Sequence, residues 1–162
     1  MVPSRHWLIR LLNFYPPYLG AGVRVRRLPD GFESRMTLRL YNRNYFGTHF
    51  GGSLYSMCDP FFVLALVERL GPGYAVWDKS AQIRFLRPGK GTVRARFEIP
   101  PDRVAEIRAE ADRTGRVAPE FHADVVDAGG EIVASIDKVV SVKRAAGPTS
   151  QPLAASPPSN TR

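Results

Sequence analysis

The feature that most restricts the fold of this chain is a long apolar segment, residues 53–70. At 3.6 residues per turn its apolar side chains cover nearly the whole circumference of a helix, so that helix must be enclosed by other elements. Pro60 lies inside the segment, directly after the acid Asp59, and removes one backbone hydrogen bond there. The segment therefore predicts one long buried helix with a kink next to Asp59.

Strand-forming patterns flank this helix on both sides. In the clearest of them Met36, Leu38 and Leu40 alternate with polar residues, which is typical of a half-buried strand. Turn signals separate neighbouring strands, Pro-Asp-Gly at 29–31 and Asp-Ala-Gly-Gly at 127–130. The predicted strands are 22–28, 32–41, 75–85, 91–99, 121–127 and 132–142, and a charged helix is predicted at 101–114.

These elements predict an α+β fold. One helix that is apolar all round, together with five or six strands, buries its surface only if the sheet wraps around it. We therefore expect the hotdog fold, a curved antiparallel β-sheet wrapped around one long central α-helix, over residues 21–144. Residues 1–20 are expected to form an amphipathic helix and a proline turn, and residues 145–162 a disordered tail rich in Pro, Ser and Ala.

The charge and composition of the chain limit the kinds of ligand and partner that it is expected to bind. The formal net charge is +8, which favours an anionic ligand, but the basic residues are scattered and no nucleic-acid-binding motif is present, so no nucleic acid is expected. Cys58 is the single cysteine, and a cytoplasmic location and a packing role for this thiol are expected. The N-terminal helix, which carries Trp7, has two open interpretations: it packs against the domain, or it contacts a membrane surface.

Candidate chemistry lies at the start of the apolar segment. Gly51 and Gly52 open the helix, where unpaired N–H groups and the helix dipole suit a carbonyl oxygen that becomes an oxyanion. Asp59 is costly in apolar surroundings unless it is paired or used. Together with Asn44, these residues indicate acyl or thioester chemistry; a plain glycine turn with a solvated aspartate is the alternative.

The pattern Asn44-x-x-Gly47-Thr48-x-x-Gly51-Gly52, with Asp59 following, resembles the hotdog-fold acyl-CoA thioesterases of the phenylacetate-pathway type. The string 47–62, with 76–79 and 83–89, is similar to a thioesterase-like branch of that superfamily. The resemblance implies that the Gly51 N–H polarises the thioester carbonyl, that Asn44 orients the substrate or water, and that Asp59 is general base or nucleophile. It implies no metal and no cofactor beyond the coenzyme A of the substrate.

The chain departs from the family pattern at two places. Phe50 precedes the glycine pair where many members have histidine, and His49 is displaced by one position; Asp78 stands where some members have serine or threonine. The residues expected to bind substrate are Gly52, His49, Phe50 and Asp78. The candidates for the coenzyme A phosphates are Arg84, Arg87, Lys90, Arg94 and Arg96; a solvated sheet face is the alternative for these basic residues.

Spacing also bears on assembly. Gly52 and Asp59 are two helical turns apart, roughly 10 Å along the axis, whereas acid–base chemistry needs contact near 3 Å. We therefore expect a composite site in a homodimer or a dimer of dimers, acting on an acyl-CoA or acyl-pantetheine. Two alternatives stay open: an acyl or acyl-CoA binding protein without catalysis, and a hydroxyacyl dehydratase or hydratase.

Overall fold

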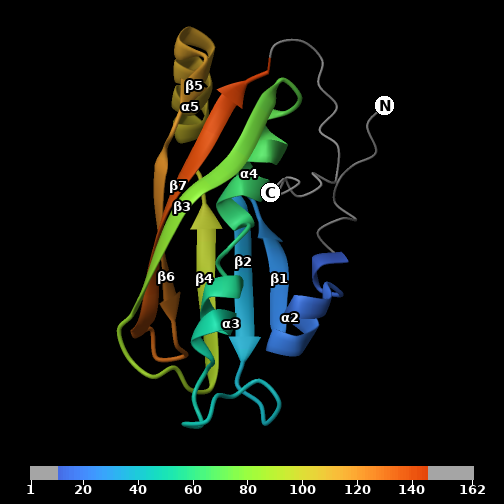
Figure 1. The fold of residues 1–162 in the computed structure, drawn as a ribbon, viewed down its shortest axis with the longest axis vertical. Helices are drawn as coiled ribbons and strands as arrows, with labels where there is room; N and C mark the ends of the chain where they lie inside the picture. The colour runs from blue at the N-terminus through green and yellow to red at the C-terminus, as the bar shows by residue number, and fades with distance from the viewer. Residues whose placement is uncertain (1–10, 146–162) are drawn as a thin grey trace, which may run out of the picture.

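The computed structural model describes residues 11–145 (Figure 1). Its strands are β1 (Val23–Leu28), β2 (Gly31–Thr37), β3 (Tyr74–Phe85), β4 (Thr92–Glu98), β5 (Arg116–Val117), β6 (Glu120–Val126) and β7 (Ile132–Arg144). The helices are α2 (Pro16–Ala21), α3 (Gly51–Ser56), α4 (Phe61–Leu70) and α5 (Pro101–Thr114). Predicted residues 1–10 of the N-terminal helix, and 146–162 of the tail, lie outside this range.

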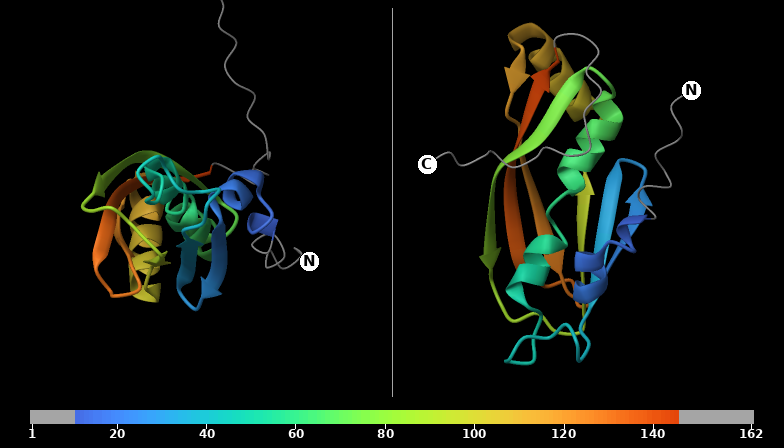
Figure 2. Two further views of the ribbon diagram at one scale, coloured as in Figure 1. Left: turned by 90° about the horizontal axis from the view of Figure 1, so that it is seen from below. Right: turned by 45° about the vertical axis from the view of Figure 1, so that its right-hand side comes forward.

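The strands form one antiparallel sheet with the order β1-β2-β4-β6-β7-β3, and β5 pairs with β7. Figure 2 shows the sheet curling around α3 and α4. On the inner face Phe32 and Phe97 pack against Phe61 of α4, with ring centroids 5.8 and 4.9 Å apart. Alternate residues along each strand lie on the outer face of the sheet, and their side chains are mostly exposed and polar. The hotdog prediction is confirmed.

The prediction of one continuous central helix is wrong. The apolar segment forms two helices, α3 and α4, separated by Met57–Pro60 (Figure 1). Asp59 therefore lies in the break and not on a helix. Pro60 is the N-cap of α4, which agrees with its lack of an N–H to donate into a preceding turn.

Two further boundaries differ from the sequence pattern. Strand β2 ends at Thr37, and Leu40 is exposed because the chain leaves the sheet before reaching it. Pro16 and Pro17 do not only end the N-terminal segment; they also begin the short helix α2, where proline is favoured because its N–H is not needed. Helix α5 has the predicted bounds, with Val104, Ile107 and Ala111 buried.

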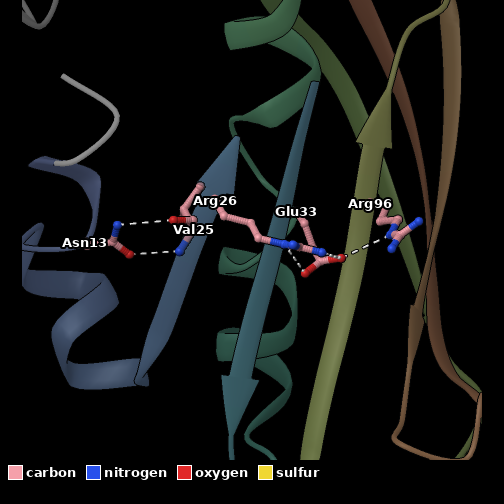
Figure 3. Close-up of polar contacts among 5 residues, drawn as sticks. All are labelled: Asn13, Val25, Arg26, Glu33 and Arg96. Atoms are coloured by element: carbon pink, nitrogen blue, oxygen red, sulfur yellow. Dashed lines mark hydrogen bonds and ion pairs between the residues drawn. The ribbon is translucent and has the colours of Figure 1, made fainter. Parts of the chain in front are cut away.

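The two edges of the sheet are different. At β1 the side-chain amide of Asn13 accepts a hydrogen bond from Val25 N (2.8 Å) and donates one to Val25 O (3.2 Å), as a neighbouring strand would (Figure 3). At β3, in contrast, most residues are exposed, including Trp77 and Phe85. The long β3 edge is therefore the open one, because nothing comparable to Asn13 covers it among residues 11–145.

Candidate active site

The break between α3 and α4 is stabilised by side chains from three other elements. Pro60 cannot donate to Ser56 O, and the Tyr18 hydroxyl of α2 donates to that carbonyl (3.3 Å). The Ser34 hydroxyl of β2 donates to Met57 O (2.6 Å). The Lys138 ammonium of β7 donates to Asp59 O. Three carbonyls at the break, those of Ser56, Met57 and Asp59, therefore receive a side-chain donor, and Ser56 O also accepts from Asp59 N (3.3 Å).

Lys138 also joins two carboxylates. Its side chain is fully buried, and Nζ lies 3.3 Å from Asp59 Oδ1 and 2.9 Å from Asp78 Oδ2. With the bond to Asp59 O, all three ammonium hydrogens have acceptors. The side chains of Asp59 and Asp78 are 47% and 36% exposed, so both carboxylates contact solvent although the ammonium group that binds them is buried. No hydrogen bond to Asp59 Oδ2 is present in the described part of the chain, but the Tyr55 hydroxyl is close to the carboxylate: burial and the Asp59 charge raise the pKa of Tyr55.

Lys138 was not among the residues expected from the sequence, although a signal was present. Along β7 the inward positions are Ala134, Ile136, Lys138, Val140 and Val142, and the lysine interrupts an otherwise apolar alternation. A charge at an inward position is costly unless it is paired, which points to nearby acids. Asp78 reaches it at the point where the register of β3 shifts, between Asp78 and Ser80.

The glycine pair lies at the start of α3, as predicted, between two aromatic rings. A Cβ on Gly51 would lie 3.2 Å from the ring of Phe85, and one on Gly52 would lie 2.5 Å from the ring of Phe50. The backbone bonds of α3 begin with Ser53 N and Leu54 N, which both donate to Phe50 O. Within residues 11–145, the preceding amides of Gly51 and Gly52 have no acceptor.

Gly51 and Asp59 are not brought together within one chain. Gly51 is the first residue of α3, whose six residues span roughly 9 Å, and Asp59 lies in the break beyond its last residue, Ser56. Phe50 is 57% exposed beside Gly52, so its ring is available to a ligand.

Asn44 and His49 have mainly internal contacts. The Asn44 amide donates to Thr48 Oγ1 (2.9 Å) and His49 O (3.2 Å) and accepts from the N–H groups of Phe46 and Thr48, which uses its whole hydrogen-bonding capacity. His49 is buried, and its Nε2 lies 3.1 Å from Gly91 O. Burial lowers the pKa of His49. Both residues shape the loop that leads to the glycine pair.

Arg84 and Arg87, two of the candidates for the coenzyme A phosphates, are already paired within the chain. Arg84 contacts Asp137 (2.7 Å), and Arg87 contacts Glu131 (2.9 Å) and donates to Ile132 O (3.0 Å). The predicted packing role of Cys58 is confirmed, since the residue is fully buried and burial raises its thiol pKa to about 12.

A groove of about 440 Å³ runs beside the start of α3. Helix α2 forms one wall through Pro17, Gly20 and Ala21, and residues 41–43 form another. Phe50 and Gly52 lie at its α3 side. The groove therefore runs along α3 and includes Gly52 of the glycine pair, while Gly51 is not in its lining. None of the helices in residues 11–145 is long and apolar enough to cross a membrane.

Solved structures share this fold. A Pseudomonas aeruginosa protein of unknown function, PA5026, described as a probable thioesterase, is 23% identical, with 88% of this chain and 98% of that one covered and a TM-score of 0.76. Thioesterase HI1161 from Haemophilus influenzae is 16% identical, with 89% and 93% covered and a TM-score of 0.62. A mutant of the P. aeruginosa thioesterase PA1618 is 11% identical, with 90% and 97% covered and a TM-score of 0.62. Fold and neighbours thus define a hotdog-fold protein similar to thioesterases.

The family follows from the sequence. Residues 5–142 match the model of the family described as Domain of unknown function (DUF4442), and the chain belongs to that family. No curated protein matches the chain.

Proposed function

We propose that this protein hydrolyses an acyl thioester, with the Asp59 carboxylate as general base or nucleophile. The observation that carries the proposal is the position of that carboxylate: it lies on a break in the central helix, one oxygen bound to buried Lys138 and the other without a partner in residues 11–145. A fixed carboxylate with a free, solvent-reached oxygen is what activation of water, or attack on a carbonyl, requires.

The oxyanion would be stabilised by the Gly51 N–H at the start of α3. This amide has no acceptor in the described structure, and the rings of Phe50 and Phe85 beside it would shield a bound thioester from water. Gly52 allows the Phe50 ring to approach the helix, and Asn44 holds the loop that precedes it. The remaining predicted contacts, those of His49, Arg84 and Arg87, would act through the fold and not on the thioester.

We propose that two copies share each site, because Gly51 and Asp59 of one chain are separated by the length of α3. The open β3 edge favours pairing with a second β3, whereas Asn13 blocks the β1 edge. Val63, Leu64 and Val67 of α4 remain half-buried in the single chain, and a second copy would cover them. Such a homodimer could pair further into a dimer of dimers.

The substrate would be an acyl-CoA or an acyl-pantetheine on a carrier. The groove beside α3 has the volume of a small-ligand site and includes Gly52, the neighbour of Gly51, so it suits the acyl chain or the pantetheine arm.

Thiol release from short, long and aromatic acyl-CoAs tests the activity. Asp59→Asn keeps the shape of the side chain, so the fold should survive while turnover falls about 10²-fold or more. Asp102→Asn, an exposed change on α5, is the matched control and should keep wild-type turnover. Equal turnover in Asp59→Asn and wild type would refute the role of this carboxylate.

Complementation tests the shared site. In a mixed dimer of Asp59→Asn and Gly51→Val subunits, one of the two sites keeps both native residues. Random mixing should restore about a quarter of the wild-type rate, although neither variant is active alone. No recovery in a mixture shown to contain mixed dimers would place Gly51 and Asp59 in the same chain's site.

A second candidate function is acyl-CoA binding without turnover. It is favoured by Phe50, which stands where the thioesterase pattern that the chain resembles has histidine, and which offers only an apolar contact. Saturable binding of acyl-CoA with no thiol release would select it.

A further inference from the structure

The outer face of strands β1, β2 and β4 carries two adjacent rows of side chains with different charge balance. In one row Arg26, Glu33 and Arg96 are cross-strand partners, and Glu33 lies between the two arginines. Glu33 accepts from Arg26 Nε (2.7 Å) and Nη2 (3.0 Å) and from Arg96 Nε (3.0 Å) (Figure 3). The Arg26 contact lowers the pKa of Glu33. This row is internally paired.

The next row has the same geometry and no acid. Arg24, Arg35 and Arg94 are direct cross-strand partners, and all three side chains are exposed. Arg24 Nη1 donates to Asn13 O (3.2 Å), whereas Arg35 and Arg94 have no ion pair or side-chain hydrogen bond within residues 11–145. All fifteen Asp and Glu residues of the sequence lie in that range, so no acidic side chain elsewhere can neutralise the row.

Three arginines side by side are unfavourable in a sheet, because like charges directly opposite each other repel. A groove of about 610 Å³ lies over this row, and Arg24, Arg35, Arg94 and Thr92 are in its lining. Two acids also line it, but Glu33 is bound by Arg26 and Arg96, and Asp127 Oδ1 accepts from the N–H groups of Gly129 and Glu131. Strands β1 and β4 are two strand spacings apart, about 10 Å, so the three guanidinium groups can surround an anion of a few ångströms. Guanidinium groups bind phosphoryl oxygens in a bidentate manner.

We propose that the row Arg24–Arg35–Arg94 is a binding site for a compact ligand that carries two adjacent phosphoryl groups. It lies on the outer face of the sheet, and Asp59 and the α3 start lie on the inner face, so it is separate from the proposed thioesterase site of the same chain. The proposal does not depend on thioester hydrolysis.

The surroundings of the row favour a small ligand over an extended polyanion. The arginines end at β4, and the next strand on this face, β6, presents Asp124 and Glu120. Further along, His122 lies between Asp124 and Asp137. A nucleic acid or a flat anionic membrane that covered the arginines would also meet these carboxylates.

The test is thermal unfolding at low ionic strength with inorganic pyrophosphate. At ten times its dissociation constant, pyrophosphate should raise the melting temperature of the wild type by about 4 °C. Arg35→Glu places an acid between two arginines, as in the neighbouring row, so it should raise the melting temperature without ligand and abolish the pyrophosphate effect. Arg35→Gln should raise the melting temperature without ligand by less, and should reduce the pyrophosphate effect without abolishing it.

Lys143→Glu is the matched control, since it makes the same charge change on the exposed end of β7 and should leave the pyrophosphate effect intact. An equal pyrophosphate shift in wild type and Arg35→Glu, or no shift in either, would overturn the proposal. Two other results would also overturn it: sedimentation with phosphatidylserine vesicles, or binding of a single-stranded oligonucleotide, if either depends on Arg35 and is not displaced by pyrophosphate.

Discussion

Replacing Lys138 tests the central structural argument, that a buried cation holds the helix break and its acid. Lys138→Met keeps most of the apolar stem and removes the ammonium, so the change isolates three hydrogen bonds: to Asp59 O, Asp59 Oδ1 and Asp78 Oδ2. Removing one partner of a buried ion pair costs about 3–5 kcal/mol when the remaining charge is buried. Here the carboxylates are 47% and 36% exposed, and water can solvate them after the change.

The exposure reduces the electrostatic part of the loss, and the unpaired Asp59 carbonyl adds about 1–3 kcal/mol. We expect Lys138→Met to lower the free energy of unfolding by about 2–4 kcal/mol, a fall in melting temperature of about 6–12 °C. Urea unfolding followed by circular dichroism measures this. Lys79→Met, an exposed lysine on β3, is the control and should change stability by less than about 0.5 kcal/mol.

A double-mutant cycle identifies the cause. If the ammonium acts through the carboxylates, Asp78→Asn should cost much less in the Lys138→Met background than in the wild type, with a coupling of about 1–2 kcal/mol. Additive effects within about 0.5 kcal/mol, or a Lys138→Met variant as stable as the wild type, would refute the argument.

Two other predictions concern glycines and pH. Gly31→Ala should lower the free energy of unfolding by at least about 3 kcal/mol, because its Cβ would overlap the backbone oxygen of Phe97. Gly52→Ala should change the free energy of unfolding by less than about 1 kcal/mol, since the half-exposed Phe50 ring can turn away. Equal losses in the two variants, measured by urea unfolding, would contradict this. Burial lowers the pKa of His49, so the unfolded chain binds more protons below about pH 6.5 and stability should fall on acidification through that value. Asp137 raises the pKa of His122, which acts in the opposite sense: its stabilisation is present at low pH and is lost as pH rises through the folded pKa. Melting temperatures from pH 5 to 8 should therefore fall more steeply on acidification in His122→Gln and less steeply in His49→Gln; unchanged slopes would refute the assignment.

Much of the fold was predictable from local patterns. Alternation located the main strands to within a few residues, and the narrow stripe of Val104, Ile107 and Ala111 gave α5 its correct bounds. These elements agree with the sequence because one face of each is buried and the period is visible along the chain. Strand β2 was predicted too long because Leu38 and Leu40 continue the alternation after the chain has left the sheet.

The helix break could not be read from the apolar segment alone. Apolar periodicity reports which side chains are buried, not whether each backbone carbonyl has a donor. In this fold the donors come from Tyr18, Ser34 and Lys138, which lie far from the segment in sequence. Pro60 showed where the helix would be disturbed, but only the packing of α2, β2 and β7 against it converts a kink into a break.

The same contacts explain why the candidate site and the fold are difficult to separate. In a continuous helix the Asp59 carbonyl would accept from its own helix, and Lys138 would have only the two carboxylates to contact. The break turns that carbonyl toward the ammonium, so Lys138 binds both the main chain and the side chain of Asp59. Lys138 thereby holds the carboxylate through two atoms of the same residue, the main-chain oxygen and Oδ1. Pro60 and Lys138 therefore position Asp59 together. Pro60 interrupts the helix, which leaves the Asp59 carbonyl without a helical donor, and Lys138 donates to that carbonyl and to the Asp59 carboxylate.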